Sequence, residues 1–210
     1  MGRPRAFDET AVLDAAVGQF RVFGFGDSST EQLCEVAGVR RSSLYNTFTS
    51  KEELFVLALR RYLSVVDEAQ AAILADESLD GRGRLEALAE LVLAEERAAA
   101  QQGHAAGCMV VGAYMTPGLR ERDARITEAL DSSLERRLTL LAQAIRAGQA
   151  DGSLRRDLDP DDAALLVVTV ISGLRVDAQA GVDPDRLRRA FALGIRHFFT
   201  ASHTHQGVSR

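Results

Sequence analysis

The chain has 210 residues, 46% of them hydrophobic, which suits one ordinary domain or a small domain joined to a larger one. No run of about 18 uncharged apolar residues occurs, and the first residues lack the apolar segment of a secretory signal, so we expect a cytoplasmic protein with no membrane partner. The net charge of −5 argues against general affinity for nucleic acid, but residues 1–62 balance eight Lys/Arg against eight Asp/Glu. The excess negative charge therefore lies in the remainder of the chain, and any nucleic-acid contact should be confined to the N-terminal end.

Almost every segment shows helical periodicity, and no run has the sustained alternation of a β-strand. We therefore predict an all-α protein of about nine helices, with a small domain at residues 1–50, a larger domain at 51–203 and a frayed tail at 204–210. In chain order, helices are predicted at residues 8–24, 29–37, 41–47, 50–75, 82–102, 119–150, 160–180 and 184–201, with a less regular segment at 103–118.

Local sequence features define the boundaries of the first helices. Gly24 and Gly26 are expected to end the first one. Ser29 followed by Gln32, and Ser50 followed by Glu53, have the spacing of capping boxes, in which the two side chains satisfy backbone N–H groups reciprocally. These pairs predict where the second and fourth helices begin.

A helix-turn-helix is predicted around Gly38, which interrupts the second helix just before the third one begins. In that arrangement the second helix of the pair lies in the DNA major groove, with its N-terminal residues nearest the bases. Leu44 and Phe48 are four residues apart and should point inward, while the other side chains of 41–47 carry hydrogen-bonding groups. A polar face that simply meets solvent is the alternative. The turn, the two caps and a basic arm of Arg3 and Arg5 favour DNA.

Residues 1–60 resemble the DNA-binding domain of TetR-family transcriptional regulators, through "GRPR", "VLDAAVGQF", "FGFGDSSTEQLCEVAGV" and "SSLYNTFTSKEELF". The resemblance implies an all-helical homodimer with a larger ligand-binding and dimerisation domain, which binds a pseudo-palindromic operator and usually represses transcription. It also implies a set of DNA-contacting side chains: Thr30, Arg41, Ser42, Ser43, Tyr45, Asn46 and Lys51. Arg40 departs from the family, which often has a capping Ser or Thr there, but it adds a charge that could reach a phosphate.

The segment "GHAAGCMVVGAYMTPG" resembles one found in a subset of these regulators that includes electrophile and redox sensors. Cys108 is therefore either a reactive thiol, which requires a lowered pKa from a cation such as Arg97 or Arg120, or a small buried side chain. Cys34 lies among core positions of the second predicted helix. A disulfide between the two is not expected in a reducing compartment. His104 and Cys108, four residues apart, supply only two ligands, so we predict no metal and no cofactor.

Two further sets of residues are candidates in the larger domain. A small apolar or amphipathic inducer would contact Leu88, Leu91, His104, Cys108, Met109, Tyr114 and Met115. The predicted helix at 160–180 is apolar on most sides, as in a core or against another chain, and the helix at 184–201 follows it. A dimer interface would contain Leu165, Leu166, Val170, Leu174, Leu187, Phe191, Ile195 and Phe198. A plain core within one chain is the alternative for both sets.

The favoured hypothesis is a repressor that a small-molecule inducer releases from a palindromic, double-stranded operator, with sensing through Cys108 as the alternative mechanism. A helical enzyme lacks support, because Ser, His and Asp occur without motif context and no glycine-rich phosphate loop is present. A helical interaction protein without DNA affinity is disfavoured by the basic arm and the polar third helix.

Overall fold

The computed structural model describes residues 8–101, 103, 105–116 and 118–200. Over these residues the chain forms ten α-helices and one 3₁₀ turn, and β-pairing is limited to an isolated bridge between Leu154 and Phe199. The elements are α1 (Glu9–Asp27), α2 (Thr30–Ala37), α3 (Arg41–Phe48), α4 (Lys51–Leu74), α5 (Gly81–Ala100), α6 (Met109–Met115), α7 (Leu119–Arg122), α8 (Ala124–Asp151), α9 (Pro160–Gln179), α10 (Pro184–Ile195) and η1 (Arg196–Phe198). The prediction of an all-α fold is confirmed.

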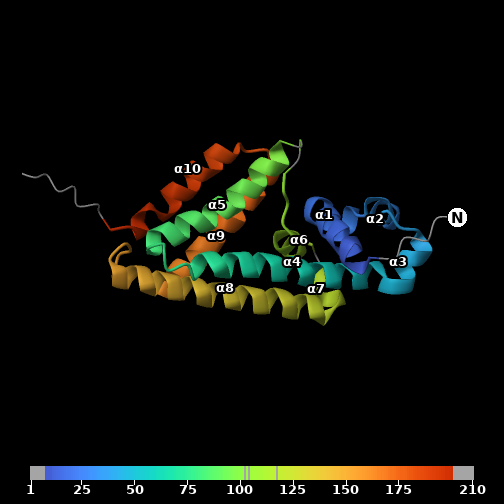
Figure 1. Cartoon of the computed structure of the whole chain (residues 1–210), viewed down its shortest axis with the longest axis horizontal. Coiled ribbons are helices and arrows are strands. Elements are labelled where there is room, and N and C mark those ends of the chain that lie inside the picture. Colours follow the sequence, from blue (N-terminus) through green and yellow to red (C-terminus); the bar gives the residue numbers. More distant parts are fainter. Residues whose placement is uncertain (1–7, 102, 104, 117, 201–210) are drawn as a thin grey trace, which may run out of the picture.

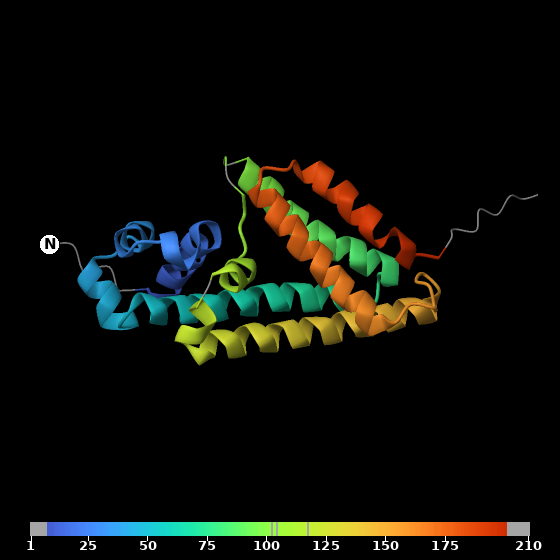
Figure 2. The same cartoon turned by 180° about the vertical axis from the view of Figure 1, so that it is seen from behind.

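The helices form a small group at one end of an elongated molecule and a larger group at the other. Helices α1–α3 make the small group, while α5, α9 and α10 pack together at the far end (Figure 1). Helices α4 and α8 lie side by side along the length, and both views show α4 running from the small group into the body (Figure 2). A displacement of α4 therefore acts on both ends of the molecule.

Two apolar clusters hold these groups together. The first joins α1–α3 to the first half of α4, to α6 and α7 and to the start of α8, with Phe20, Phe48 and Phe55 among its fully buried members. The second joins the end of α4 to α5, α8, α9 and α10. The first cluster continues past residue 50 into α4, so the apolar packing is not divided at the predicted domain boundary, which stays a prediction.

The structure corrects three predicted helix limits. Gly24 bends α1 rather than ending it, because its backbone (φ 71°, ψ −179°) suits glycine and the helix resumes to Asp27. The helix predicted at 119–150 is interrupted at Asp123, whose extended backbone (φ −149°) places its side chain to cap α8. The last helix ends at Ile195 and not at residue 201, and a turn of 3₁₀ helix follows.

One of the two predicted capping boxes is complete. At α2, Ser29 Oγ accepts from the Gln32 N–H at 3.2 Å, and Gln32 Oε1 accepts from the Ser29 N–H at 2.7 Å. At α4, Ser50 Oγ accepts from the Glu53 N–H at 3.0 Å, but the Glu53 carboxylate accepts from Arg125 on α8 at 2.7 Å. The Glu53 carboxylate thus pairs with Arg125 instead of accepting from the Ser50 N–H, which is the second hydrogen bond of a capping box.

Candidate nucleic-acid interface

The turn between α2 and α3 has the geometry that the sequence predicts. Gly38 adopts a left-handed conformation (φ 64°, ψ 29°), which a side chain would make costly. Its N–H donates to the Glu35 carbonyl at 3.1 Å, and the next N–H, of Val39, donates to the Cys34 carbonyl at 3.0 Å. These bonds close α2 within two residues, so α3 can begin at Arg41.

Helix α3 is anchored by its apolar side and presents its polar side outward. Leu44 and Phe48 are 3% and 1% exposed and belong to the first apolar cluster. The remaining side chains of α3 are polar and form its polar surface: Arg41, Ser42, Asn46 and Thr47 are exposed, and Ser43 and Tyr45 are half-buried. The sequence-based division of this helix into an inward and an outward face agrees with the structure.

Contacts between α2 and α3 hold part of this surface in place. The hydroxyls of Thr30 and Tyr45 share a hydrogen bond of 2.9 Å. The guanidinium of Arg41 lies 5.6 Å from the Tyr45 ring centroid and donates to the Glu31 carboxylate at 3.1 Å. Both charged partners are about 70% exposed (67% and 71%), so the ion pair contributes little stability and its arginine is available to exchange a carboxylate for a phosphate or a guanine edge.

Two helix N-termini flank the polar surface, at Ser29 on α2 and Ser50 on α4. Free N–H groups and the helix dipole make such ends suitable for phosphate. Lys51 lies beside the second one, with its Nζ 4.4 Å from the Phe25 ring centroid, and partial burial lowers its pKa. Arg40 occupies the N-cap position of α3 and is exposed. Its side chain makes no capping hydrogen bond, because a guanidinium has no acceptor atom. Arg3 and Arg5 lie outside the described residues.

Ion pairs attach the small group of helices α1–α3 to the long helices α4 and α8. Asp14 on α1 accepts from Arg61 on α4, with Oδ2 at 2.8 Å from Nη2, and this hydrogen bond lowers the pKa of Asp14. Arg125 on α8 joins Glu53 on α4 to Asp123, and its hydrogen bonds lower the pKa of Asp123. Helix α4 is thus tied to α1 on one side and to α8 on the other.

A buried charged cluster links α1, α5 and α9, and the sequence analysis did not predict it. Arg175 on α9 donates to Glu96 at 2.8 Å and to Glu95 at 2.7 Å, both on α5. Glu95 also accepts from Arg21 on α1 at 3.0 Å, while Glu96, which is 2% exposed, accepts from the Ala106 N–H at 3.0 Å. A lone arginine in the apolar run of α9 was the one available sequence signal, because buried arginine requires a partner.

The comparisons with known proteins agree with this geometry. Residues 12–58 match the family described as bacterial regulatory proteins, tetR family, and residues 81–193 match the tetracyclin repressor-like C-terminal domain. The chain is 30% identical over 207 residues to the transcriptional regulator AcuR of Cereibacter sphaeroides, covering 95% of this chain and 91% of that protein. The chain belongs to the TetR family. It is 28% identical over 195 residues to the HTH-type transcriptional repressor ComR of Escherichia coli, covering 93% of this chain and 90% of ComR.

Solved TetR-family structures share the whole fold. A cysteine mutant of the regulator CifR, complexed with double-strand operator DNA of 26 base pairs, superposes with a TM-score of 0.76 at 30% identity, over 94% of this chain and 100% of that one. The reduced form of NemR from E. coli superposes with a TM-score of 0.75 at 23% identity, over 93% and 100% of the two chains. This TetR-family chain is a DNA-binding transcriptional regulator.

Cys108 lies at the junction of the TetR-type DNA-binding group and the body. It caps α6, is half-buried, and its Sγ accepts from the Tyr62 hydroxyl on α4 at 3.6 Å. Burial and then the nearby Cys108 raise the pKa of Tyr62 above its usual range, so the hydroxyl stays protonated. The neighbouring Gly107 is packed so closely on α1 that a Cβ there would lie 1.9 Å from the Arg21 carbonyl oxygen.

The residues predicted to line a ligand pocket do not come together. Leu88 and Met109 are buried in different apolar clusters, and Leu91 is half-buried. Tyr114 and Met115 are 40% and 76% exposed on α6, and His104 lies outside the described residues. This ligand-contacting set stays a prediction, because hydrophobic spacing on a helix does not tell whether neighbouring helices leave space beside it.

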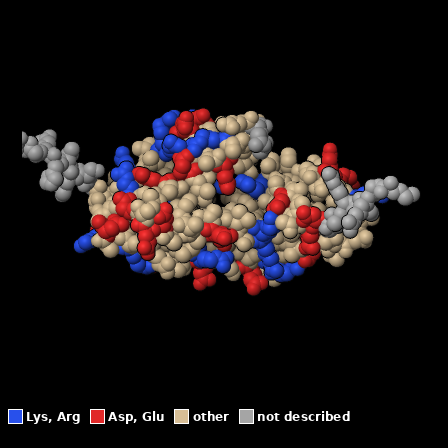
Figure 3. All heavy atoms as spheres, viewed as in Figure 1, with Lys and Arg blue, Asp and Glu red and all other residues tan. Residues whose placement is uncertain are grey.

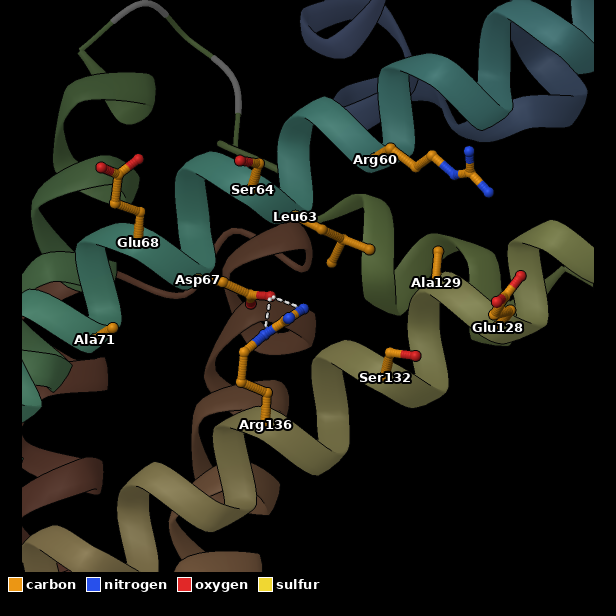
Figure 4. A pocket seen from close by; sticks show the side chains of 10 residues that line it. All are labelled: Arg60, Leu63, Ser64, Asp67, Glu68, Ala71, Glu128, Ala129, Ser132 and Arg136. Carbon is orange, nitrogen blue, oxygen red and sulfur yellow. Dashed lines mark hydrogen bonds and ion pairs between the residues drawn. The ribbon is translucent and has the colours of Figure 1, made fainter.

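Cavities are found elsewhere. A groove of about 560 Å³ lies between α4 and α8 and is crossed by the ion pair of Asp67 with Arg136 (2.9 Å), which Figure 4 shows between the two helices. A more enclosed cavity of about 390 Å³ lies between α5 and α10.

The predicted dimer residues divide into two groups. Leu174, Leu187, Phe191, Ile195 and Phe198 are 0–4% exposed in the core of their own chain, so their assignment to a chain–chain contact is wrong. Val170 is half-buried against the same core, whereas Leu165 and Leu166 are 51% and 42% exposed. Helix α9 is apolar on most sides, and its hydrophobicity alone could not tell the face that packs inward from the face left open.

Neither cysteine is in a disulfide, and the described residues contain no group of three or more His, Cys, Asp or Glu placed to hold a metal. Over the same residues, no helix is apolar for long enough to cross a bilayer.

Proposed function

We propose that this regulator is a homodimeric repressor that leaves a palindromic operator when a small molecule binds its body. The observation that carries the proposal is the outward face of α3, where Arg41, Ser42 and Asn46 are exposed directly after the Gly38 turn. An arginine side chain can bind guanine edges and phosphates, and an asparagine side chain can bind adenine. A serine hydroxyl can bind phosphate or either class of base. CifR, 30% identical, is complexed with operator DNA, which supports the same use of this face.

A dimer is supported by an unpartnered apolar stripe on α9 and α10. Leu165, Leu166 and Val176 on α9 are 51%, 42% and 51% exposed, and Leu193 on α10 is 61% exposed. Thr169 and Gly173 lie between them at helical spacing and leave room for a second helix. Two half-sites on one face of DNA lie about 34–36 Å apart, so two recognition helices must be held in a fixed pair.

Release of DNA would be a population shift through α4. This helix begins three residues after α3 ends, and its ion pairs with Asp14 and Arg125 fix it to both α1 and α8. In one conformation the two recognition helices fit the operator, and in another their spacing differs. A ligand that binds the second conformation more tightly lowers operator affinity, at most by the ratio of its affinities for the two conformations.

The operator can be found by sequencing the DNA that co-purifies with the protein, and the proposal is then tested by gel-shift titration. We expect Arg41→Ala and Tyr45→Ala each to weaken operator binding about tenfold or more, because a good base or phosphate contact contributes about 1–3 kcal/mol. Arg122→Ala is the matched control, since this exposed arginine on α7 lies far along the chain from α3. Unchanged binding by both α3 variants would contradict the assigned face.

Sensing through Cys108 is the second candidate, and its place beside Tyr62 and next to Gly107, which packs on α1, favours it. An electrophile such as N-ethylmaleimide would add its double-bond carbon to the thiolate sulfur, and the adjacent carbon would take a proton from water. The added bulk would separate the loop from α1. Operator release by this reagent should be lost in Cys108→Ser and kept in Cys34→Ser, since burial raises the pKa of Cys34 and disfavours its thiolate. Release retained in Cys108→Ser would exclude this mechanism.

A further inference from the structure

The cavity between α5 and α10 has an apolar floor inside the body of the molecule. Leu93, Phe191 and Ile195 form this floor and are 1%, 3% and 0% exposed. Its volume of about 390 Å³ lies within the range of small-molecule sites, about 300–1,000 Å³. The cavity lies between α5 and α10, whereas three of the four exposed apolar residues of the stripe lie on α9, which Figure 2 shows in front of α5.

The rim of the cavity carries more positive than negative charge. Its two carboxylates are already paired, Glu86 with Arg82 at 2.8 Å and Glu90 with Arg188 at 2.7 Å. Arg196 also lines the cavity, and no carboxylate among the described residues pairs with it. Charged side chains of both signs gather over α5 and α10 in Figure 3, although the chain as a whole is acidic. An anionic group at this rim would therefore meet an arginine without a competing acid.

The apolar wall and the charged rim meet at Phe199. The guanidinium of Arg82 lies 4.5 Å from the Phe199 ring centroid, and the ring is half-buried. Both side chains line the cavity, and this cation–π contact holds the arginine against the ring. A molecule with an apolar body and one anionic head matches both surfaces.

We propose that the α5–α10 cavity binds an amphipathic carboxylate, with its head on Arg196 and Arg188 and its apolar body on the floor. The planar guanidinium fork matches the two oxygens of a carboxylate. The regulatory consequence, release of DNA, rests on the proposed function, whereas the binding site does not.

The position of the cavity gives such a ligand a route to the DNA-binding end. Glu90 pairs with both Arg188 and Arg97, so a ligand carboxylate on Arg188 competes with a carboxylate of α5. The same helix carries Glu95, which accepts from Arg21 on α1 at 3.0 Å. A shift of α5 therefore acts directly on the ion pair that joins the body to the DNA-binding group.

Isothermal titration calorimetry of the full chain with octanoate tests the site, and octylamine serves as the probe of opposite charge. We expect saturable binding of octanoate and at least about tenfold weaker binding of octylamine. Arg196→Gln should weaken octanoate binding about tenfold, and Ala192→Phe, which fills the cavity from its exposed wall, should abolish it. Arg186→Gln is the matched control, because it removes the same charge from α10 outside the cavity.

Three calorimetric results would contradict the proposed carboxylate site. No octanoate binding, equal binding of octylamine, or unchanged binding by Arg196→Gln and Ala192→Phe in proteins with wild-type thermal unfolding would overturn the site. A gel-shift titration with octanoate then tests the consequence. Failure of the chain to bind any operator would refute the proposed function and leave the calorimetric result standing, so the two failures are distinguishable.

Discussion

Removal of the Arg175 guanidinium should be among the most destabilising single changes in this protein. Its side chain is 8% exposed and that of Glu96 is 2% exposed, and the two are joined at 2.8 Å. Although burial alone lowers the pKa of Arg175, the neighbouring Glu95 carboxylate raises it, and the pKa lies above its usual value overall, so the arginine is charged. Arg175→Met keeps most of the volume but leaves Glu96 with the Ala106 N–H as its remaining partner.

Breaking a buried ion pair from one side costs about 3–5 kcal/mol, because a charge stays buried without its counter-ion. We expect a loss of this size in the free energy of unfolding, measured by urea titration with circular dichroism at fixed protomer concentration. Adding Glu96→Gln should recover much of the loss, since a neutral amide can still accept from Ala106. Arg146→Met is the control, because its ion pair with Asp161 is 52% and 72% exposed and should contribute at most about 1 kcal/mol. A loss below about 1 kcal/mol for Arg175→Met, or no recovery in the double variant, would refute this reasoning.

Three further predictions follow from packing and charge. Gly107→Ala should destabilise by about 1–3 kcal/mol or more in the same urea assay, because its Cβ would meet the Arg21 carbonyl oxygen at 1.9 Å, whereas Gly103→Ala, with open space at φ 82°, should cost less. Leu165→Glu should convert the proposed dimer to monomers in light scattering, because it would bury an unpaired charge, and an intact dimer would count against the α9–α10 stripe. Asp14 has a folded pKa below its unfolded value, so its ion pair stabilises above about pH 4 and this stabilisation is lost as the pH falls. Asp14→Asn should therefore lose less stability between pH 6 and pH 3 than the wild type, and an equal loss would contradict the assignment.

The local geometry of the small group of helices α1–α3 could be predicted from the sequence, because it depends on neighbours within a few residues. The cap at Ser29, the left-handed turn at Gly38 and the inward pair of Leu44 and Phe48 are all local relationships. Backbone hydrogen bonds and helical periodicity determine them without reference to the rest of the chain. The outward face of α3 follows as the complement of its apolar side.

Only the tertiary structure determines which side chains of the body pair with one another and which stay exposed. Glu96 and Arg175 are 79 positions apart, and no local pattern pairs them. Helix α9 is apolar nearly all round, so the choice between the buried Leu174 and the exposed Leu165 depended on where α5, α8 and α10 pack. The α5–α10 cavity is likewise lined by residues about a hundred positions apart, such as Leu93 and Phe191, so it depends on the relative placement of the two helices. Sequence periodicity specifies which side of a helix is apolar, whereas packing between distant helices specifies what that side contacts.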